Sequence, residues 1–281
     1  MIKRATTDDL EQIYQMLIKA QDNPQMYSGF MSENPTRLKE DLMDLIINKR
    51  VLMDSDHEIK GVLTFSPQFK DKIFDVAGPF VLAEDVFIAF ELCQVLIHEL
   101  TPGSQLNFFF RKESRFYRQL MALLGAIHQS DEYILSLHKN RFQSSGHLDI
   151  KIAQAEDFDA IQQLHDEIFP KAYIPGKKII VPSDSTVLYV LKEEDIVGYA
   201  YLKQYQGIMM LEVFALALKY RNQKKSVPFL KSILHHIFQT RAVDEVRLVV
   251  EELNEVATHI YKQCGFQIYY ENSAYQLNTS L

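Results

Sequence analysis

The sequence predicts an α/β protein of two tandem domains, each a twisted mixed β-sheet flanked by helices. Its 281 residues are 47% hydrophobic and 24% charged, which is ordinary globular composition and enough chain for two cores. Short strand-like patterns interleave with helical ones throughout, so both domains mix the two structures. The order of elements in residues 1–140 returns in residues 148–281, after a small, polar linker at residues 141–147.

The first half starts with a short alternating strand at residues 2–5. Capping and acidic residues at 7–9 then open a helix that runs to about residue 20. A further helix follows Asn34-Pro35, and Gly125 ends the last one. The remaining elements are strands at 51–53, 59–65, 74–81 and 106–110 and helices at 84–100 and 114–124. We expect Gly78-Pro79 to interrupt the strand at 74–81.

The second half repeats this plan. Its expected elements are strands at 150–153, 186–191, 196–202, 211–218 and 247–250 and helices from 155, at 225–240 and at 256–263. When Gly265 is aligned with Gly125, Tyr261 falls on Met121 and Asn254 on Ser114. The order of elements and the turn residues carry the match, so the halves are interpreted as a duplication.

Composition excludes several classes of function. The formal net charge is −7, so duplex nucleic acid is not an expected partner. Two cysteines form no disulfide framework, and no Cys/His cluster has metal-binding spacing. There is no signal-peptide core and no apolar run of transmembrane length, so we expect no membrane partner and a cytoplasmic setting. Monomer and homodimer both remain open.

The stretch from 211 to 266 is the most informative part of the chain. A strand that leads through a tight turn into a helix points free backbone N–H groups at one spot, and the helix dipole adds to them. Such a site suits a pyrophosphate. Here the turn carries Arg221, Lys224 and Lys225, which can add charge-assisted hydrogen bonds.

This stretch resembles the GNAT superfamily of N-acetyltransferases. The resemblance is carried by the strand and turn at 214–226 and by Leu248-Val249-Val250 followed by Asn254, Ala257, Tyr261 and Gly265-Phe266. It covers residues 148–277, whereas the first half matches in layout only. It implies an acetyl-coenzyme A site in the second half. Lys224 and Ser226 stand where the family usually has glycine, which makes the turn less permissive.

The resemblance also implies roles for individual residues. Tyr261 would give a proton to the leaving sulfur, and Glu212 is the candidate base. By strand alternation, Glu212 is expected to share a face with Leu216. Residues 171–176 are a candidate loop over the cleft. The residues expected to bind the coenzyme, through the backbone for the first two, are Leu216, Leu218, Arg221, Asn222, Gln223, Lys224, Lys225, Ser226, Val227 and Asn254.

Structural alternatives stand beside these roles. Tyr261 is also compatible with a half-buried helix aromatic, and Asn254 with a helix cap. His235-His236 and Cys264 are interpreted as packing residues. Met121 and Ser114, together with the acidic pair Glu84-Asp85, predict that the first half has no catalytic role.

The function favoured by the resemblance is acetyl-CoA-dependent transfer of an acetyl group to a primary amine of a small molecule or peptide. The alternative is a non-catalytic tandem protein that binds coenzyme A or a protein partner. A third reading is transfer of a longer acyl or an aminoacyl group.

Overall fold

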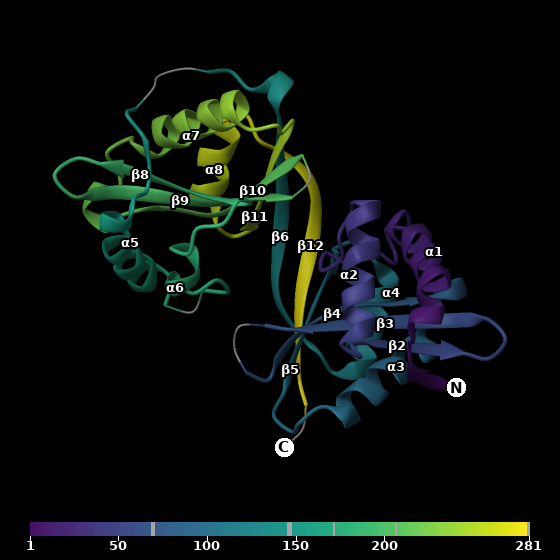
Figure 1. The fold of residues 1–281 in the computed structure, drawn as a ribbon. Helices are drawn as coiled ribbons and strands as arrows, with labels where there is room; N and C mark the ends of the chain where they lie inside the picture. Colours follow the sequence, from purple (N-terminus) through teal and green to yellow (C-terminus); the bar gives the residue numbers. More distant parts are fainter. Residues whose placement is uncertain (69–70, 145–147, 171, 206, 280–281) are drawn as a thin grey trace. The chain divides into compact units, whose positions relative to one another are not determined.

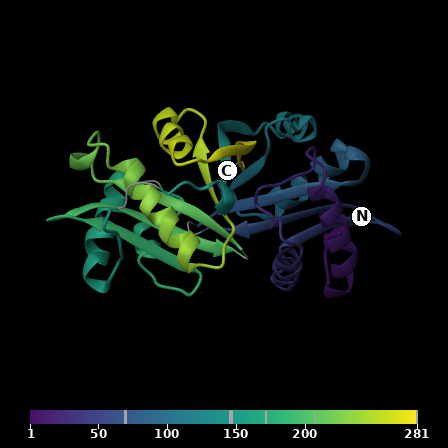
Figure 2. The ribbon, with the colours of Figure 1, turned by 90° about the horizontal axis from the view of Figure 1, so that it is seen from above.

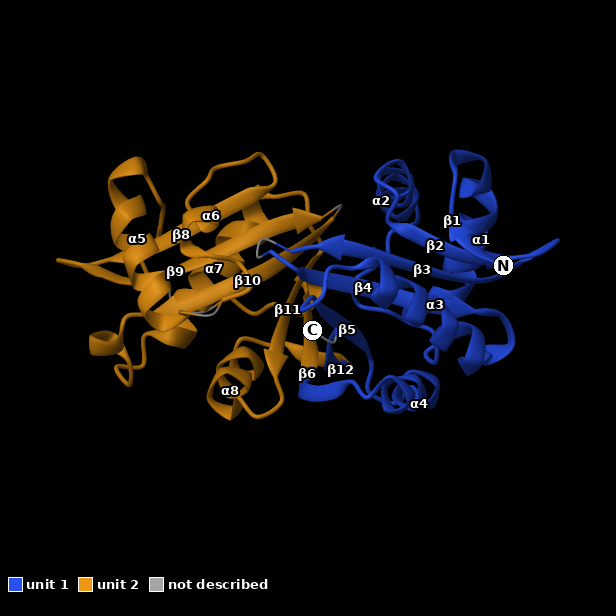
Figure 3. Ribbon diagram, turned by 90° about the horizontal axis from the view of Figure 1, so that it is seen from below, with its two compact units in different colours: residues 1–132, 271–281 blue, residues 133–270 orange. Residues whose placement is uncertain are grey.

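The computed structural model describes residues 1–281 apart from 69–70, 145–147, 171, 206 and 280–281 (Figure 1). The chain divides into two compact units (Figure 3). Unit 1 comprises Met1–Glu132 and Glu271–Leu281, and unit 2 comprises Tyr133–Tyr270. These boundaries differ from the predicted domains, because the C-terminal residues belong to the first unit. Ser145, Gly146 and His147 of the predicted linker lie outside the described residues.

Unit 1 contains a mixed sheet. Its strands are β1 (Ile2–Arg4), β2 (Val51–Ser55), β3 (Ile59–Pro67), β4 (Ile73–Val81), β5 (Gln105–Arg111) and part of β12 (Gln267–Asn278), hydrogen-bonded in the order β1-β2-β3-β4-β5-β12. Its helices are α1 (Leu10–Gln21), α2 (Pro35–Ile47), α3 (Val86–Glu99) and α4 (Arg115–Leu124). Helices α1 and α2 cover one face of this sheet, and α3 and α4 the other (Figure 2, Figure 3).

The helix ends of unit 1 follow the predicted turn chemistry. The side chain of Asn34 accepts a hydrogen bond from the backbone of Arg37 at the start of α2. Gly125 ends α4 in the left-handed conformation, with a φ of 68°. The predicted interruption at Gly78-Pro79 affects the pairing and not the strand: β4 runs to Val81, but its pairing with β3 shifts register between Ala77 and Phe80.

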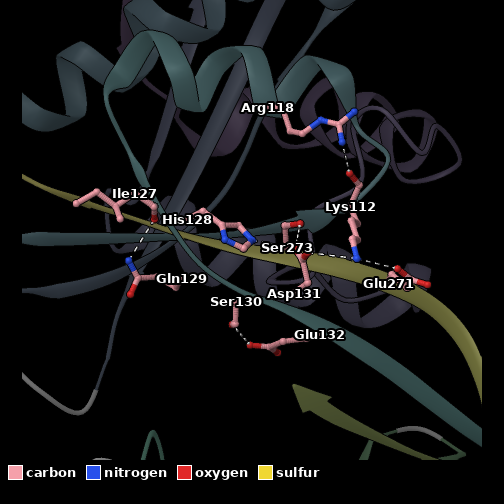
Figure 4. Close-up of polar contacts among 10 residues, drawn as sticks. All are labelled: Lys112, Arg118, Ile127, His128, Gln129, Ser130, Asp131, Glu132, Glu271 and Ser273. Atoms are coloured by element: carbon pink, nitrogen blue, oxygen red, sulfur yellow. Dashed lines mark hydrogen bonds and ion pairs between the residues drawn. The ribbon is translucent and has the colours of Figure 1, made fainter. Parts of the chain in front are cut away.

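Polar side chains hold the C-terminal strand in unit 1 (Figure 4). The Asp131 carboxylate accepts hydrogen bonds from Ser273 Oγ at 2.5 Å and His128 Nε2 at 2.9 Å, and Lys112 Nζ lies 3.2 Å away. Lys112 also pairs with Glu271 at 3.3 Å. Burial alone would raise the pKa of Asp131, but these donors outweigh it and hold the pKa below its ordinary value. Because Ser273 donates to the carboxylate and not to the imidazole, the group is structural and not a nucleophilic triad.

Unit 2 repeats the architecture. Its strands are β6 (Ile127–His138, shared with unit 1), β7 (Lys151–Ile152), β8 (Thr186–Lys192), β9 (Ile196–Tyr205), β10 (Ile208–Leu216) and β11 (Glu245–Glu251), hydrogen-bonded in the order β6-β11-β10-β9-β8-β7. Its helices are α5 (Ala155–Ile168), α6 (Gly176–Ile179), α7 (Ser226–Thr240) and α8 (Glu255–Gln263).

Helices cover both faces of the unit 2 sheet (Figure 1). A separate apolar core lies on each face. Apolar residues of α7, including Phe229 and Ile233, pack on one face with Leu216. Ile161 of α5 and Ile179 of α6 pack on the other face with Tyr199 and Ala215. Strand β10 therefore lies between two helical layers, which fixes its position on both sides. No helix of the described chain is both long and apolar enough to cross a membrane.

Candidate active site

The two central strands of unit 2 separate along their length. In the parallel pairing of β10 with β11, only residues Ile208–Met210 of β10 pair with residues Glu245–Arg247 of β11. Beyond that point a cavity of about 1030 Å³ opens, lined by the later residues of both strands, by the turn before α7 and by α8. Strand β10 is thus paired with β9 on one edge and faces the cavity on the other.

The open edge of β10 offers backbone groups to a ligand. The Ala217 N–H donates to Val197 on β9 at 2.9 Å, so in this antiparallel pair alternate residues point their backbone groups toward β9. The groups of Phe214 and Leu216 consequently point toward the cavity. Arg221 Nε donates to the Leu216 carbonyl at 3.2 Å, which leaves the Leu216 N–H and both groups of Phe214 for an added strand.

The predicted strand at 211–218 ends earlier, at Leu216. Leu218 lies in a 3₁₀ turn, Leu218–Tyr220, is 59% exposed and does not line the cavity. Gly198 on β9 permits the close fit of the two strands, because a Cβ there would lie 2.5 Å from the Ala215 carbonyl oxygen.

The turn before α7 has the backbone shape of a glycine-rich loop without its glycines. Asn222 and Lys224 both adopt the left-handed conformation, with φ of 61° and 58°. The turn leads to Ser226, the first residue of α7, where the first helical N–H groups have no intrahelical partner. Asn222, Lys224, Ser226 and Val227 line the cavity. Lys224 thus keeps the conformation that glycine would supply and adds a charge.

Two of the predicted coenzyme ligands in this turn have other contacts. Lys225 forms an ion pair with Glu193 and lies 5.1 Å from the centre of the Tyr220 ring. Gln223 Nε2 donates to the Lys219 carbonyl at 2.8 Å. Neither lines the cavity, whereas Arg221 does. The structure therefore brings only part of the predicted cationic turn to the site.

Helix α8 contributes Asn254 and Tyr261 to the cavity wall. Asn254 caps the helix, its Oδ1 accepting from the Ala257 N–H at 3.1 Å. Tyr261 packs edge-on against Phe266, with ring centres 6.0 Å apart. Burial raises the pKa of Tyr261 to about 12. The hydroxyl therefore keeps its proton at neutral pH and can donate it.

Cys264, at the end of α8, is a packing residue. Its side chain is buried, and burial raises the pKa of the thiol to about 12. Its Sγ lies 3.9 Å from the Val227 carbonyl oxygen. A thiol that stays protonated is a poor nucleophile, so this cysteine has no part in the chemistry.

Glu212 stands at a bulge in β10, where pairing with β9 skips from Leu211 to Val213. The expectation that it shares a face with Leu216 was wrong, because a bulge inserts a residue and breaks the alternation. Its carboxyl group is hydrogen-bonded to Tyr205. By strand alternation, Tyr205 shares the face of Tyr199 and Tyr201, which pack under α5. Leu216 packs on the opposite face, under α7.

The surroundings of Glu212 favour its protonated form more than water does. Burial raises the pKa of its carboxyl group, although Lys203 and the hydrogen bond with Tyr205 oppose the shift. Glu212 also lines the cavity. A carboxylate with a raised pKa, at the wall of a cavity, is a suitable general base for an amine.

His165 was not among the predicted site residues, yet it lines the cavity and is 1% exposed. Its Nε2 lies 2.9 Å from the Ile174 carbonyl, which can only accept, so Nδ1 accepts from the Tyr199 hydroxyl at 2.8 Å. Burial lowers the pKa of His165 and keeps the ring neutral. The ring thus ties residues 172–174, part of the predicted loop, to the sheet. Lys171 of that loop lies outside the described residues.

In unit 1 the corresponding space between β4 and β5 is filled by the chain itself. Parallel pairing of these strands ends at Val76 and Phe108. Past that point the Gly29 N–H donates to the Phe109 carbonyl at 2.8 Å, and Ser28 forms an antiparallel bridge with Phe110. The segment at residues 25–29 therefore pairs with the edge of β5, which corresponds to the edge that β11 leaves open in unit 2.

Helix α4 of unit 1 fixes this segment. The Tyr117 hydroxyl is 3.1 Å from the Met26 carbonyl and 3.3 Å from the Pro79 carbonyl. Ser114 Oγ, at the position aligned with Asn254, donates to the Gln25 carbonyl at 2.8 Å. At the start of α3, the Asp85 carboxylate accepts from two backbone N–H groups. The cleft and the helix N-terminus of unit 1 are both occupied by protein groups.

The family model described as the acetyltransferase (GNAT) family matches residues 154–266. Residues 154–266 are a GNAT domain. This domain includes the cavity, the turn before α7 and helix α8, all of which lie in unit 2. The GNAT domain therefore comprises every element that the sequence assigned to the coenzyme site.

Solved structures share the fold over the whole chain. A GCN5-related N-acetyltransferase from Sphaerobacter thermophilus has a TM-score of 0.76 and 14% identity, with 100% of this chain and 96% of that chain covered. A tandem GNAT protein from the clavulanic acid biosynthesis pathway has a TM-score of 0.67 and 10% identity, with 100% and 99% covered. A GNAT-family acetyltransferase from Colwellia psychrerythraea has a TM-score of 0.56 and 12% identity, with both chains covered in full. The GNAT domain thus belongs to a chain with a tandem GNAT fold.

Proposed function

We propose that the GNAT domain transfers an acetyl group from acetyl-CoA to a primary amine of a small molecule or peptide. The observation that carries the proposal is the cavity beside β10, which joins an open strand edge, a helix N-terminus and a protonated tyrosine. Each of these matches one part of the reaction: binding of an extended thioester arm, binding of phosphates, and protonation of the leaving sulfur.

The residues present fit acetyl-CoA. The free N–H groups at the start of α7 and the side chain of Lys224 suit a pyrophosphate. The N–H and carbonyl of Phe214 suit the two amides of a pantetheine arm, which would extend the sheet at its open edge. When bound, acetyl-CoA supplies an activated acetyl group as a thioester.

The side chains of this chain then handle two protons. Glu212 accepts a proton from the amine, directly or through a water, because burial raises the pKa of its carboxyl group toward that task. The Tyr261 hydroxyl, with a pKa of about 12, holds a proton for the sulfur that leaves. The Leu216 N–H faces the cavity and can donate to an oxygen on which negative charge develops.

The test measures free-thiol release from acetyl-CoA with amine acceptors, comparing the parent chain with Tyr261→Phe. We expect kcat to fall by about 10²- to 10⁴-fold, the usual contribution of a positioned acid, with little change in the affinity for acetyl-CoA. Tyr269→Phe is the matched control, because Tyr269 is 54% exposed and does not line the cavity. An unchanged rate in Tyr261→Phe at neutral pH would remove Tyr261 from the mechanism.

A further inference from the structure

The cavity of unit 2 has two ends of different character. Among the described residues that line it, the cations are Arg221 and Lys224, and both belong to the turn before α7. The far end is formed by the end of α5, residues 172–174 and the bulge of β10. We call this the apolar end and define it by Ile168, Phe169, Ala172, Ile174 and Val213.

The walls of the apolar end come from the core under α5. Ile168, Ile174 and Val213 all pack against that core and also face the cavity. Phe169 is 36% exposed, and its ring centre lies 5.4 Å from that of His165. A ligand group placed here meets aliphatic and aromatic surface, and burying apolar area there is favourable.

The acidic group at this end is Glu212. Its carboxyl group lies at the bulge next to Val213. Lys203, whose charge opposes the rise in the pKa of Glu212, has its Nζ over the Tyr205 ring, 4.8 Å from the ring centre. Lys203 does not line the cavity, whereas Glu212 does. A cationic ligand group at the bulge would therefore meet a carboxylate, and an anionic one would meet repulsion without a partner.

The position of the apolar end is fixed and not adjustable. The neutral His165 ring joins the Tyr199 hydroxyl on the sheet to the Ile174 carbonyl, and the Gly176 N–H donates to Asp166 Oδ1 at 3.2 Å. These bonds hold residues 172–174 against the cavity from both sides. A wall held in this way selects its ligand by shape and polarity.

We propose that the acceptor, whose acetylation is the function proposed above, is a monoamine with an apolar body and no negative charge beside the amine. Its ammonium group lies at Glu212, and its apolar body contacts Phe169, Ile174 and Val213. Glu212 takes the first proton from the ammonium group, and the neutral amine then forms the amide bond to the acetyl carbon as the carbon–sulfur bond breaks. The sulfur leaves with the proton of Tyr261, and the second proton that the nitrogen loses restores the Tyr261 hydroxyl.

Matched acceptor pairs test this inference in the full chain. 2-Phenylethylamine is compared with phenylalanine, which adds only a carboxylate, and hexylamine with 1,6-diaminohexane, which adds only a second charge. We expect kcat/KM to be at least about tenfold higher for the first member of each pair, because the second buries an unpaired charge. Phe169→Lys should lower kcat/KM for 2-phenylethylamine and hexylamine, because it places a cation where their apolar bodies lie.

Calorimetry with acetyl-CoA separates the two proposals. If acetyl-CoA binds but phenylalanine or 1,6-diaminohexane is acetylated as well as its partner, the acceptor class is overturned and the proposed function stands. Binding without transfer to either apolar amine also overturns the acceptor class. Absence of acetyl-CoA binding overturns the proposed function and the acceptor class together. Retained acetyl-CoA affinity in Phe169→Lys shows that this variant is folded.

Discussion

Replacing Lys224 separates two contributions of one residue: the backbone conformation of the turn before α7 and the charge beside the expected phosphates. A left-handed residue other than glycine costs roughly 1–2 kcal/mol, and Lys224 has a φ of 58°. Lys224→Ala keeps that cost and removes the charge. Lys224→Gly removes both, but glycine adds about 0.5–1 kcal/mol of chain entropy to the unfolded state.

The stability comparison follows from these magnitudes. Lys224→Gly should have a free energy of unfolding about 0–1.5 kcal/mol above that of Lys224→Ala, since the relieved strain equals or exceeds the added entropy. Urea denaturation without ligand measures this difference. A glycine variant clearly less stable than the alanine variant would show that the left-handed turn carries no strain.

The binding comparison isolates the charge. A hydrogen bond to a charged group contributes about 1.5–3 kcal/mol, so both variants should weaken acetyl-CoA binding by about 10- to 150-fold. Lys225→Ala is the control, because the Lys225 ammonium pairs with Glu193 outside the cavity lining, and it should stay within about twofold of the parent. S-acetylpantetheine, which lacks the phosphates, should bind all variants equally. Parent-like affinity in Lys224→Ala would refute the phosphate role.

Three further outcomes are expected. Glu212→Gln should abolish the rise of kcat with pH that follows ionisation of Glu212. Because burial raises the pKa of this carboxyl group, the free energy of unfolding of the parent falls as the pH rises from the unfolded pKa to the folded pKa. By urea denaturation, the variant should therefore be more stable than the parent at neutral pH and equally stable below about pH 4. Gly198→Ala should lower the free energy of unfolding by about 1–3 kcal/mol and weaken coenzyme binding, because its Cβ would press on the β10 backbone; denaturation and calorimetry measure the two effects. Tyr117→Phe should lower the free energy of unfolding by about 1–3 kcal/mol while leaving kcat unchanged, because the Tyr117 hydroxyl bonds the segment that fills the cleft of unit 1 and not the active site.

Local signals predicted most of the fold. Caps such as Asn34 and glycines such as Gly125 and Gly265 act within a few residues, so their positions mark helix ends directly. Strands β6 and β12 were not predicted, because each starts with exposed residues and carries few apolar ones in strict alternation. The unit to which the C-terminal residues belong depends on pairing between β12 and β5, which no local pattern encodes.

Some features of the candidate site were also predicted from local sequence, whereas others depend on contacts between distant segments. The turn before α7 and the α8 residues were found because they follow one another in the sequence, and Tyr261 and Lys224 do line one cavity. The face of Glu212 was predicted wrongly, since the bulge beside it is set by pairing with β9. His165 could have been noticed as a polar residue four positions after Ile161 on the apolar side of α5, although its partners could not.

The degenerate character of the first half also gains a physical explanation. The sequence predicted it from Met121 and from the acidic residues before α3. The filling of its cleft by residues 25–29 depends on contacts between segments about 80 to 90 positions apart, such as Ser114 with Gln25. Unit 1 therefore lacks the residues expected to bind a coenzyme, and residues 25–29 also fill the cleft in which it would lie.

The most direct test is titration calorimetry of the full chain with acetyl-CoA. We expect one binding site per chain, in unit 2, and a gain in the free energy of unfolding of about 2.7 kcal/mol when acetyl-CoA is present at a hundred times its dissociation constant. Two sites per chain would contradict the closed cleft of unit 1. No binding at millimolar acetyl-CoA would contradict the coenzyme site itself.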